Sequence, residues 1–412
     1  AYISSGVLNT NRVSSVSHAR TERNQVTALL NYNTRIDKHN ISALLGSEYF
    51  NEKAFSSSAA TRYSPTDLIF TMNVGSEAQG VPTSAHTEYA IASMFGQLNY
   101  DYDYKYILGL TFRYDGTSRL ADHKYGFFPG ISTGWNIHNE DFFNVDWINN
   151  LKLRASYGSV GNRPSALYPQ YDLYSISQSY NTRPGALISQ IGNRDLTWEK
   201  SYTAGVGVDA TFVDRVRLTL DYYEKKTDNL LYRVPISGLT GVTAIWKNVG
   251  EVNNRGFEAT AGVDIIKNKN LLWSIDGNIG LNRNKVNKLY GEESQMIIGD
   301  GSNIAGSSQK LLKPGLDSDS WYLREWAGVN PANGAPQWYK TVIGENGEET
   351  RELTSNYAEA NSVVIGAYTP DFFGGFSTDL FYKDFDFSAV FGFSVGGKIC
   401  NYSRQEYDAD GA

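Results

Sequence analysis

One stretch of this sequence, residues 201–231, constrains the fold most because its side chains alternate in character at every second position. Its first half has apolar or aromatic residues at Tyr202, Ala204, Val206, Val208, Ala210 and Phe212. After the break at 213–215, the alternation resumes at Val216, Leu218, Leu220 and Tyr222. A period of two is that of a β-strand, so the stretch predicts an antiparallel hairpin with one apolar and one polar face. Such a hairpin suits either a soluble sandwich or a sheet between lipid and water.

The same pattern recurs along the chain and predicts about twelve strands in six hairpins. We expect them at 25–32, 41–49, 90–100, 104–114, 127–137, 151–157, 202–212, 216–223, 257–265, 271–281, 372–382 and 385–395. Residues 1–21 are interpreted as a loop or the frayed part of a strand, and 51–86 as a long loop. Short turns, and one connector at 139–150 with a possible helical turn, alternate with long loops, the longest at 282–370.

This alternation of short and long connections is typical of a transmembrane antiparallel β-barrel with short periplasmic turns and long extracellular loops. The strand lengths also suit a tilted membrane strand, and no apolar run is long enough for a spanning helix. The 28 tyrosines and 39 glycines favour β structure with many turns, and a net charge of -7 argues against nucleic acid as a partner. The only cysteine, Cys400, excludes an internal disulfide framework. We therefore expect an all-β barrel wall in preference to a soluble sandwich or propeller.

Several segments resemble the barrel half of SusC/RagA-type TonB-dependent transporters, in the order in which that family has them. They are FFPGISTGWNIHNEDFF (127–143), INNLKLRASYGSVGN (148–162), LTWEKSYTAGVGVD (196–209), LDYYEKKTDNLL (220–231), VGEVNNRGFEATAGV (249–263) and GGFSTDLFYKDFDFSAVFGFSVGGKI (374–399). The resemblance implies a bacterial outer membrane location and a barrel of twenty-two strands with an internal plug and a segment that contacts TonB. It also implies a SusD-like surface lipoprotein as partner and oligosaccharides or peptides as substrates.

The chain departs from the family pattern at both ends. Residues 1–412 hold about twelve of the expected strands, without the plug, the TonB box or the final strands, and Ala1 opens the chain without a signal peptide or start Met. Twelve strands alone would leave two edges with unpaired backbone groups in lipid. We therefore expect 1–412 to be a partial barrel domain of a longer polypeptide, or a piece completed by another chain.

No pattern in the sequence supports catalysis, a metal or a cofactor. Residues 130–134 match the G-x-S-x-G motif of hydrolases, but they lie in an alternating strand where that motif needs a strand-to-helix turn. The five histidines lack metal-ligand spacing, and 408–411 has only part of a calcium loop. The acidic pairs at 292–293 and 348–349 fall in loops, where solvation is the simplest interpretation. The sequence predicts a protein that is not an enzyme.

Two groups of residues are candidates for contacts with substrate or partner. Aromatic side chains in the long loops could stack on sugars, clamp a peptide, bind a partner or only pack the loops: Trp246, Trp321, Tyr322, Trp326 and Trp338. Charged residues are expected to face the lumen at Lys105, Arg113, Arg154, Asp209, Arg217, Glu258, Asp264 and Asp276. Three functions compete: TonB-driven import of an oligomeric nutrient, import of a siderophore or vitamin, and a soluble carbohydrate-binding or structural role.

Overall fold

The computed structural model describes residues 3–4, 7–8, 11–66, 68–69, 71–180, 183–290, 295–298, 309–343 and 348–401. The acidic pair 292–293 and the partial calcium loop 408–411 lie outside these residues. No helix of the described residues is long and apolar enough to cross a membrane.

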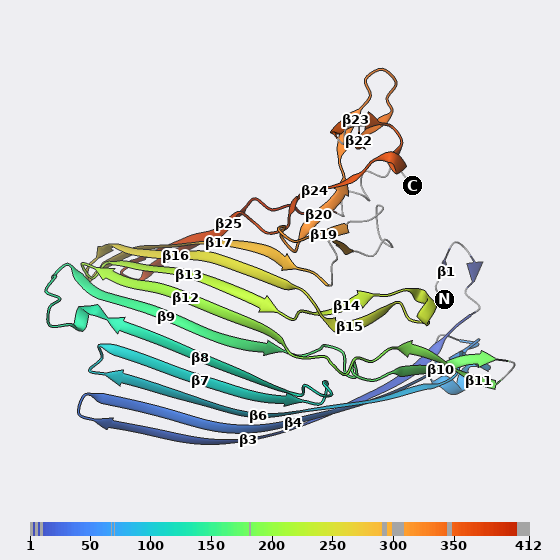
Figure 1. The fold of residues 1–412 in the computed structure, drawn as a ribbon, viewed down its shortest axis with the longest axis horizontal. Coiled ribbons are helices and arrows are strands. Elements are labelled where there is room, and N and C mark those ends of the chain that lie inside the picture. Colours follow the sequence, from blue (N-terminus) through green and yellow to red (C-terminus); the bar gives the residue numbers. More distant parts are fainter. Residues whose placement is uncertain are drawn as a thin grey trace.

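Twelve long strands form one antiparallel sheet in which neighbours in sequence are neighbours in space (Figure 1). Their order from one edge to the other is β3-β4-β6-β7-β8-β9-β12-β13-β16-β17-β25-β26, with the short strand β5 (Glu77–Ala78) paired to β4. The twelve strands and six hairpins predicted from the alternation are confirmed. Their bounds are β3 Ser14–Ile36, β4 His39–Arg62, β6 Thr83–Tyr102, β7 Tyr106–Thr117, β8 Tyr125–Asn136, β9 Ile148–Asn162, β12 Glu199–Phe212, β13 Val216–Asp228, β16 Glu251–Lys267, β17 Leu271–Lys288, β25 Phe372–Tyr382 and β26 Phe385–Val395.

Several strands extend well beyond the alternating segments, most of all β3 and β4, which have 23 and 24 residues. The interpretation of residues 14–21 as a loop or frayed end was therefore wrong, and so was that of 51–62 and 83–86 as loop. The extensions are rich in Ser and Ala and carry few large apolar residues, so no hydrophobic period marks them. Backbone pairing needs no such period, and ion pairs such as Arg23–Glu52 (2.6 Å) add cross-strand contacts.

The short connections all lie at one end of the sheet and the long ones at the other (Figure 1). The turn between β12 and β13 has positive φ at both Val213 (46°) and Asp214 (54°), the geometry of a hairpin turn whose twist matches its strands. The connector between β8 and β9 begins with one turn of 3-10 helix, η2 (Ile137–Asn139), which lies at the start of the connector and not among the acidic and aromatic residues that follow Asn139, where it was expected.

The long loops contain further short strands and turns. Their bounds are β1 Ile3–Ser4, β2 Val7–Leu8, η1 Met72–Val74, β10 Leu173–Tyr180, β11 Arg183–Gln190, β14 Leu231–Pro235, η3 Gly238–Thr240 and β15 Ala244–Asn248. In the described part of the longest insertion, two small sheets form, β18-β19-β20-β24 and β21-β22-β23. Their bounds are β18 Met296–Ile298, β19 Gln309–Leu312, β20 Ser320–Arg324, β21 Trp326–Val329, β22 Pro336–Ile343, β23 Glu349–Thr354, η4 Tyr357–Glu359 and β24 Ser362–Ala367. The insertion is thus not the structureless loop that its composition suggested.

The two faces of the large sheet differ as the alternation predicts. Large apolar side chains on one face are exposed, among them Leu110, Ile131, Tyr157, Val206, Tyr222, Phe257, Ile279 and Phe376. We call this the apolar face, and the opposite one, which carries Arg154, Asp209 and Arg217, the polar face. A sheet that shows such side chains to its surroundings is stable only where those surroundings are apolar, as in a bilayer.

Aromatic rings form a row on the apolar face at the end with the short turns. Neighbouring rings are His39 and Tyr102 (5.0 Å between centroids), then Tyr106, Trp135 and Phe142 at successive spacings of 6.4 Å. Such rows mark the level of the lipid headgroups in membrane barrels, because their rings have both an apolar body and a polar edge.

Candidate functional site

On the polar face, Arg154 of β9 joins three neighbouring strands. Its guanidinium contacts Asp209 of β12 at 2.7 Å and Asp221 of β13 at 3.0 Å. The hydroxyl of Thr219 also donates a hydrogen bond to Asp209 (3.1 Å). The arginine thereby links β9 to β13, which are separated by β12, in addition to the backbone hydrogen bonds between neighbouring strands.

The same arrangement recurs two strands further on, around Arg217 of β13. Arg217 contacts Asp264 of β16 at 2.9 Å and Asp276 of β17 at 3.0 Å, and Lys267 also contacts Asp264 at 3.0 Å. Five of the charges that the sequence assigned to one polar face are thus brought together in two clusters: Arg154 with Asp209, and Arg217 with Asp264 and Asp276.

Both clusters depend on a Gly-Val-Asp tripeptide, at residues 207–209 and 262–264. In each, the glycine lies in register between the arginine and the more distant aspartate, and the tripeptide's own aspartate supplies the second carboxylate. A Cβ at Gly207 would lie 2.8 Å from Nη2 of Arg154 and would also clash with Asp221. The glycine therefore leaves the space in which the guanidinium crosses its strand.

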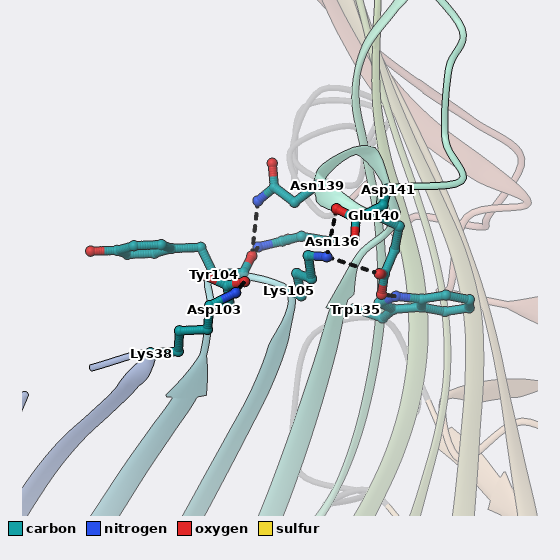
Figure 2. Close-up of polar contacts among 9 residues, drawn as sticks. All are labelled: Lys38, Asp103, Tyr104, Lys105, Trp135, Asn136, Asn139, Glu140 and Asp141. Atoms are coloured by element: carbon teal, nitrogen blue, oxygen red, sulfur yellow. Dashed lines mark hydrogen bonds and ion pairs between the residues drawn. The ribbon is translucent and has the colours of Figure 1, made fainter. Parts of the chain in front are cut away.

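The structure places Lys105 in the turn between β6 and β7, outside the strands (Figure 2). Its ammonium lies 3.4 Å from Glu140 and 3.2 Å from Asp141, both in the connector after β8. Glu140 also accepts a hydrogen bond from the indole of Trp135 (2.8 Å), a member of the aromatic row. Lys105 therefore ties a turn to a connector at the end with the short turns.

The other two charges that sequence reasoning selected, Arg113 and Glu258, form no ion pair with either cluster in the described part of the chain, although Glu258 lies next to Asp221. Arg113 of β7 contacts Asp115 at 2.8 Å and Glu48 at 3.8 Å, and it donates a hydrogen bond to the hydroxyl of Ser93 (3.0 Å). Glu258 of β16 is exposed, in register with Asp221 and Gly280.

The five loop aromatics do not form one site. Trp321 donates a hydrogen bond from its indole to the carbonyl of Lys398 (2.7 Å), and Tyr322 pairs with Gln309 and Val364 within its small sheet. In the neighbouring small sheet, Trp326 and Trp338 meet edge to face at 5.5 Å, and Trp338 meets Tyr357 in the same way at 5.2 Å. Half of Trp326 remains exposed.

Trp246 lies elsewhere, on β15, against the main hydrophobic cluster of the long-loop end. That cluster consists of Leu120, Phe128, Leu196 and Trp198. It fastens the loop after β7 and the segment before β12 to the sheet.

Sequence reasoning missed a pocket next to Trp246, on the polar face toward the long loops. It has a volume of about 770 Å³, and its walls include Phe50, Tyr89, Arg119, Arg163 and Trp246. Arg119 and Arg163 lie in loops with no period, and Tyr89 lies between the expected loop 51–86 and the expected strand 90–100, in residues that the alternation did not assign. The only signal in the sequence was the dipeptide Arg163-Pro164, which marks a loop but does not indicate that Arg163 lies over the ring of Tyr89. The described residues contain no cluster of side chains suited to a metal ion.

A family model for the β-barrel of TonB dependent receptor-like proteins matches residues 2–397. The chain belongs to this family, whose barrels lie in the outer membrane. Its SusC/RagA-type resemblance is confirmed.

Among its relatives, TonB-dependent receptor P3 of Formosa agariphila is 34% identical over 93% of this chain and 40% of its own length. TonB-dependent receptor SusC of Bacteroides thetaiotaomicron is 31% identical over 79% of this chain and 33% of its own length. A solved structure of the RagAB peptide importer superimposes with a TM-score of 0.82 at 25% identity, over 93% of this chain and 42% of that one. The chain thus spans about two fifths of the length of the relatives it matches.

Proposed function

We propose that these residues form part of the wall of an outer membrane transporter that imports an oligomeric nutrient with energy from TonB. The observation that supports this most strongly is the match of the whole twelve-strand sheet to a known peptide importer, with a TM-score of 0.82. In this proposal the polar face lines the lumen, and a plug, a TonB-contacting segment and further strands come from residues beyond 1–412. Eight charged residues would then line or border the lumen: Lys105, Arg113, Arg154, Asp209, Arg217, Glu258, Asp264 and Asp276.

The test of energy coupling is growth on an oligomer too large for passive pores. A strain that depends on the full-length protein should grow on such an oligosaccharide or peptide, and should lose that ability when TonB is removed. Growth on the corresponding monomer should be unchanged and serves as the control. Equal growth on the oligomer with and without TonB would favour a passive pore.

We further propose that the two small sheets of the longest insertion, β18-β19-β20-β24 and β21-β22-β23, contact a SusD-like surface lipoprotein. They project beyond the long-loop end of the large sheet (Figure 1), and the exposed edge of Trp326 offers a rigid aromatic surface there. Deletion of residues 320–340 should weaken co-purification of the lipoprotein while the barrel still folds. Co-purification at the unaltered level would exclude this segment as a main contact.

A further inference from the structure

The pocket beside Trp246 contains two arginines stacked on one tyrosine. The guanidinium carbon of Arg119 lies 4.1 Å from the centroid of the Tyr89 ring, and that of Arg163 lies 5.4 Å from it. Tyr89 itself is held against Phe50, with 5.7 Å between the ring centroids. Two like charges on one ring repel each other, so this arrangement is most stable when an anion lies beside them.

The carboxylates of the pocket are already engaged elsewhere. Asp115 and Glu48 both contact Arg113. Glu199 accepts hydrogen bonds from the backbone N–H of Leu231 (3.1 Å) and from Asn162 (3.5 Å). Within the part of the chain that the structure describes, neither Arg119 nor Arg163 has an ion pair with a carboxylate.

Arg119 is held in place by its surroundings and yet keeps an unused donor. Its Nη1 donates hydrogen bonds to the carbonyls of Pro164 and Ser165, both at 3.0 Å, whereas its buried Nε has no partner among the described residues. Burial, together with the charge of Arg163, lowers the pKa of Arg119. A positive charge that is half-buried and next to a second positive charge would be stabilised by an anionic ligand.

The loops that carry the two arginines are well packed. Leu120, next to Arg119, and Pro164, next to Arg163, are fully buried. The side chain of Gln170 donates a hydrogen bond to the carbonyl of Ser118 (3.0 Å) and so ties the two loops together. A site that is ordered before its ligand arrives loses less conformational freedom on binding.

We propose that this pocket binds an anionic group, a carboxylate or a sulfate, carried by the imported oligomer. The proposal rests on the proposed function and refines it by naming the charge of the substrate. Arg119 and Arg163 supply the positive charge, Tyr89 holds the two guanidinium groups in place, and Trp246 supplies flat apolar surface for the ring or chain that carries the anion. Uronic or sulfated sugars and acidic peptides share this chemistry.

The test compares charged and neutral probes on the full-length protein. Calorimetry would measure the affinity for trigalacturonate against maltotriose, and for a Glu-rich tripeptide against its Gln counterpart. The unaltered protein should bind one of the two anionic probes at least tenfold more tightly than its neutral counterpart, and the preferred pair identifies a sugar or a peptide as the carrier. R163Q should weaken binding of that anion about tenfold or more, which is the loss expected for one charge-assisted hydrogen bond.

Arg163 has no ion pair in the described part of the chain, so its replacement should leave the barrel folded, and the folded band on gels checks this. R194Q is the matched control, because Arg194 pairs with Asp122 outside the pocket (2.9 Å). Equal affinity for charged and neutral probes, or undiminished binding of the anion by folded R163Q, would overturn the proposal. TonB-dependent growth on a neutral oligomer would in that case still support the proposed function, so the two failures are distinguishable.

Discussion

Replacement of Ile275 by arginine tests which face of the sheet meets lipid. Ile275 is on β17, and its in-register neighbours are Val263 of β16 and Thr378 of β25. An arginine there would place a charge in the apolar part of the bilayer. Asn278→Arg is the control, because Asn278 lies three residues away on the polar face, in register with Thr260.

The expected cost follows from the position of Ile275 in the apolar band. On β17 the apolar face runs from Leu271 to Leu281, and its next residue is Arg283. At about 3.4 Å per residue and a tilt of about 45°, this span is roughly 24 Å high, close to the apolar band of outer-membrane barrels at about 25 Å. Ile275 lies roughly 2 Å from its middle and Ile279 roughly 7 Å.

Ile275→Arg should therefore destabilise the barrel by about 3 kcal/mol, Ile279→Arg by about 2 kcal/mol, and Asn278→Arg by less than about 0.5 kcal/mol. The full-length protein would be folded into lipid vesicles over a series of urea concentrations. The heat-modifiable folded band on gels measures the folded fraction. If Asn278→Arg lowers the folded fraction as much as Ile275→Arg does, the face assignment is refuted.

Two further changes test polar contacts, one within the strands on the polar face and one at the end with the short turns. Gly207→Ala should destabilise the barrel by about 1 kcal/mol more than Gly205→Ala. At Gly207 the new Cβ displaces the Arg154 ion pairs, whereas at Gly205 the atom nearest to a new Cβ is 3.4 Å away. Equal urea midpoints of the two variants would contradict this. Hydrogen bonds from Tyr106 and Trp135 lower the pKa of Glu140 in the folded protein. The ionised carboxylate therefore stabilises the folded state near pH 7, and this stabilisation is lost as the pH falls through the folded-state pKa. Glu140→Gln should therefore reduce the difference between the free energies of unfolding at pH 7 and at pH 4. An unchanged difference would show that the Glu140 contacts contribute nothing to stability.

Sequence reasoning predicted the strands that cross the apolar band, their hairpin partners and the face of the residues within them, whereas Lys105, expected on a strand, lies in a turn. It could do so because alternation at every second residue is a local property, set by a sheet with lipid on one side. Along 14–21 and 51–62 neither face carries a regular run of apolar residues, so that period disappears, and the strands could not be recognised although backbone pairing continues.

The sequence by itself thus determined the twelve-strand wall and which charges lie on its polar face. Only the tertiary structure decided which charges meet. Arg154 reaches Asp221 because strand register places Gly207 between them, and register depends on pairing between segments far apart in the chain. The pocket around Tyr89 also required the folded molecule, because its walls come from residues as distant as Gln25 and Trp246 and its two arginines, Arg119 and Arg163, lie in loops. Loop packing is set by contacts across the whole sheet, and no local pattern records it.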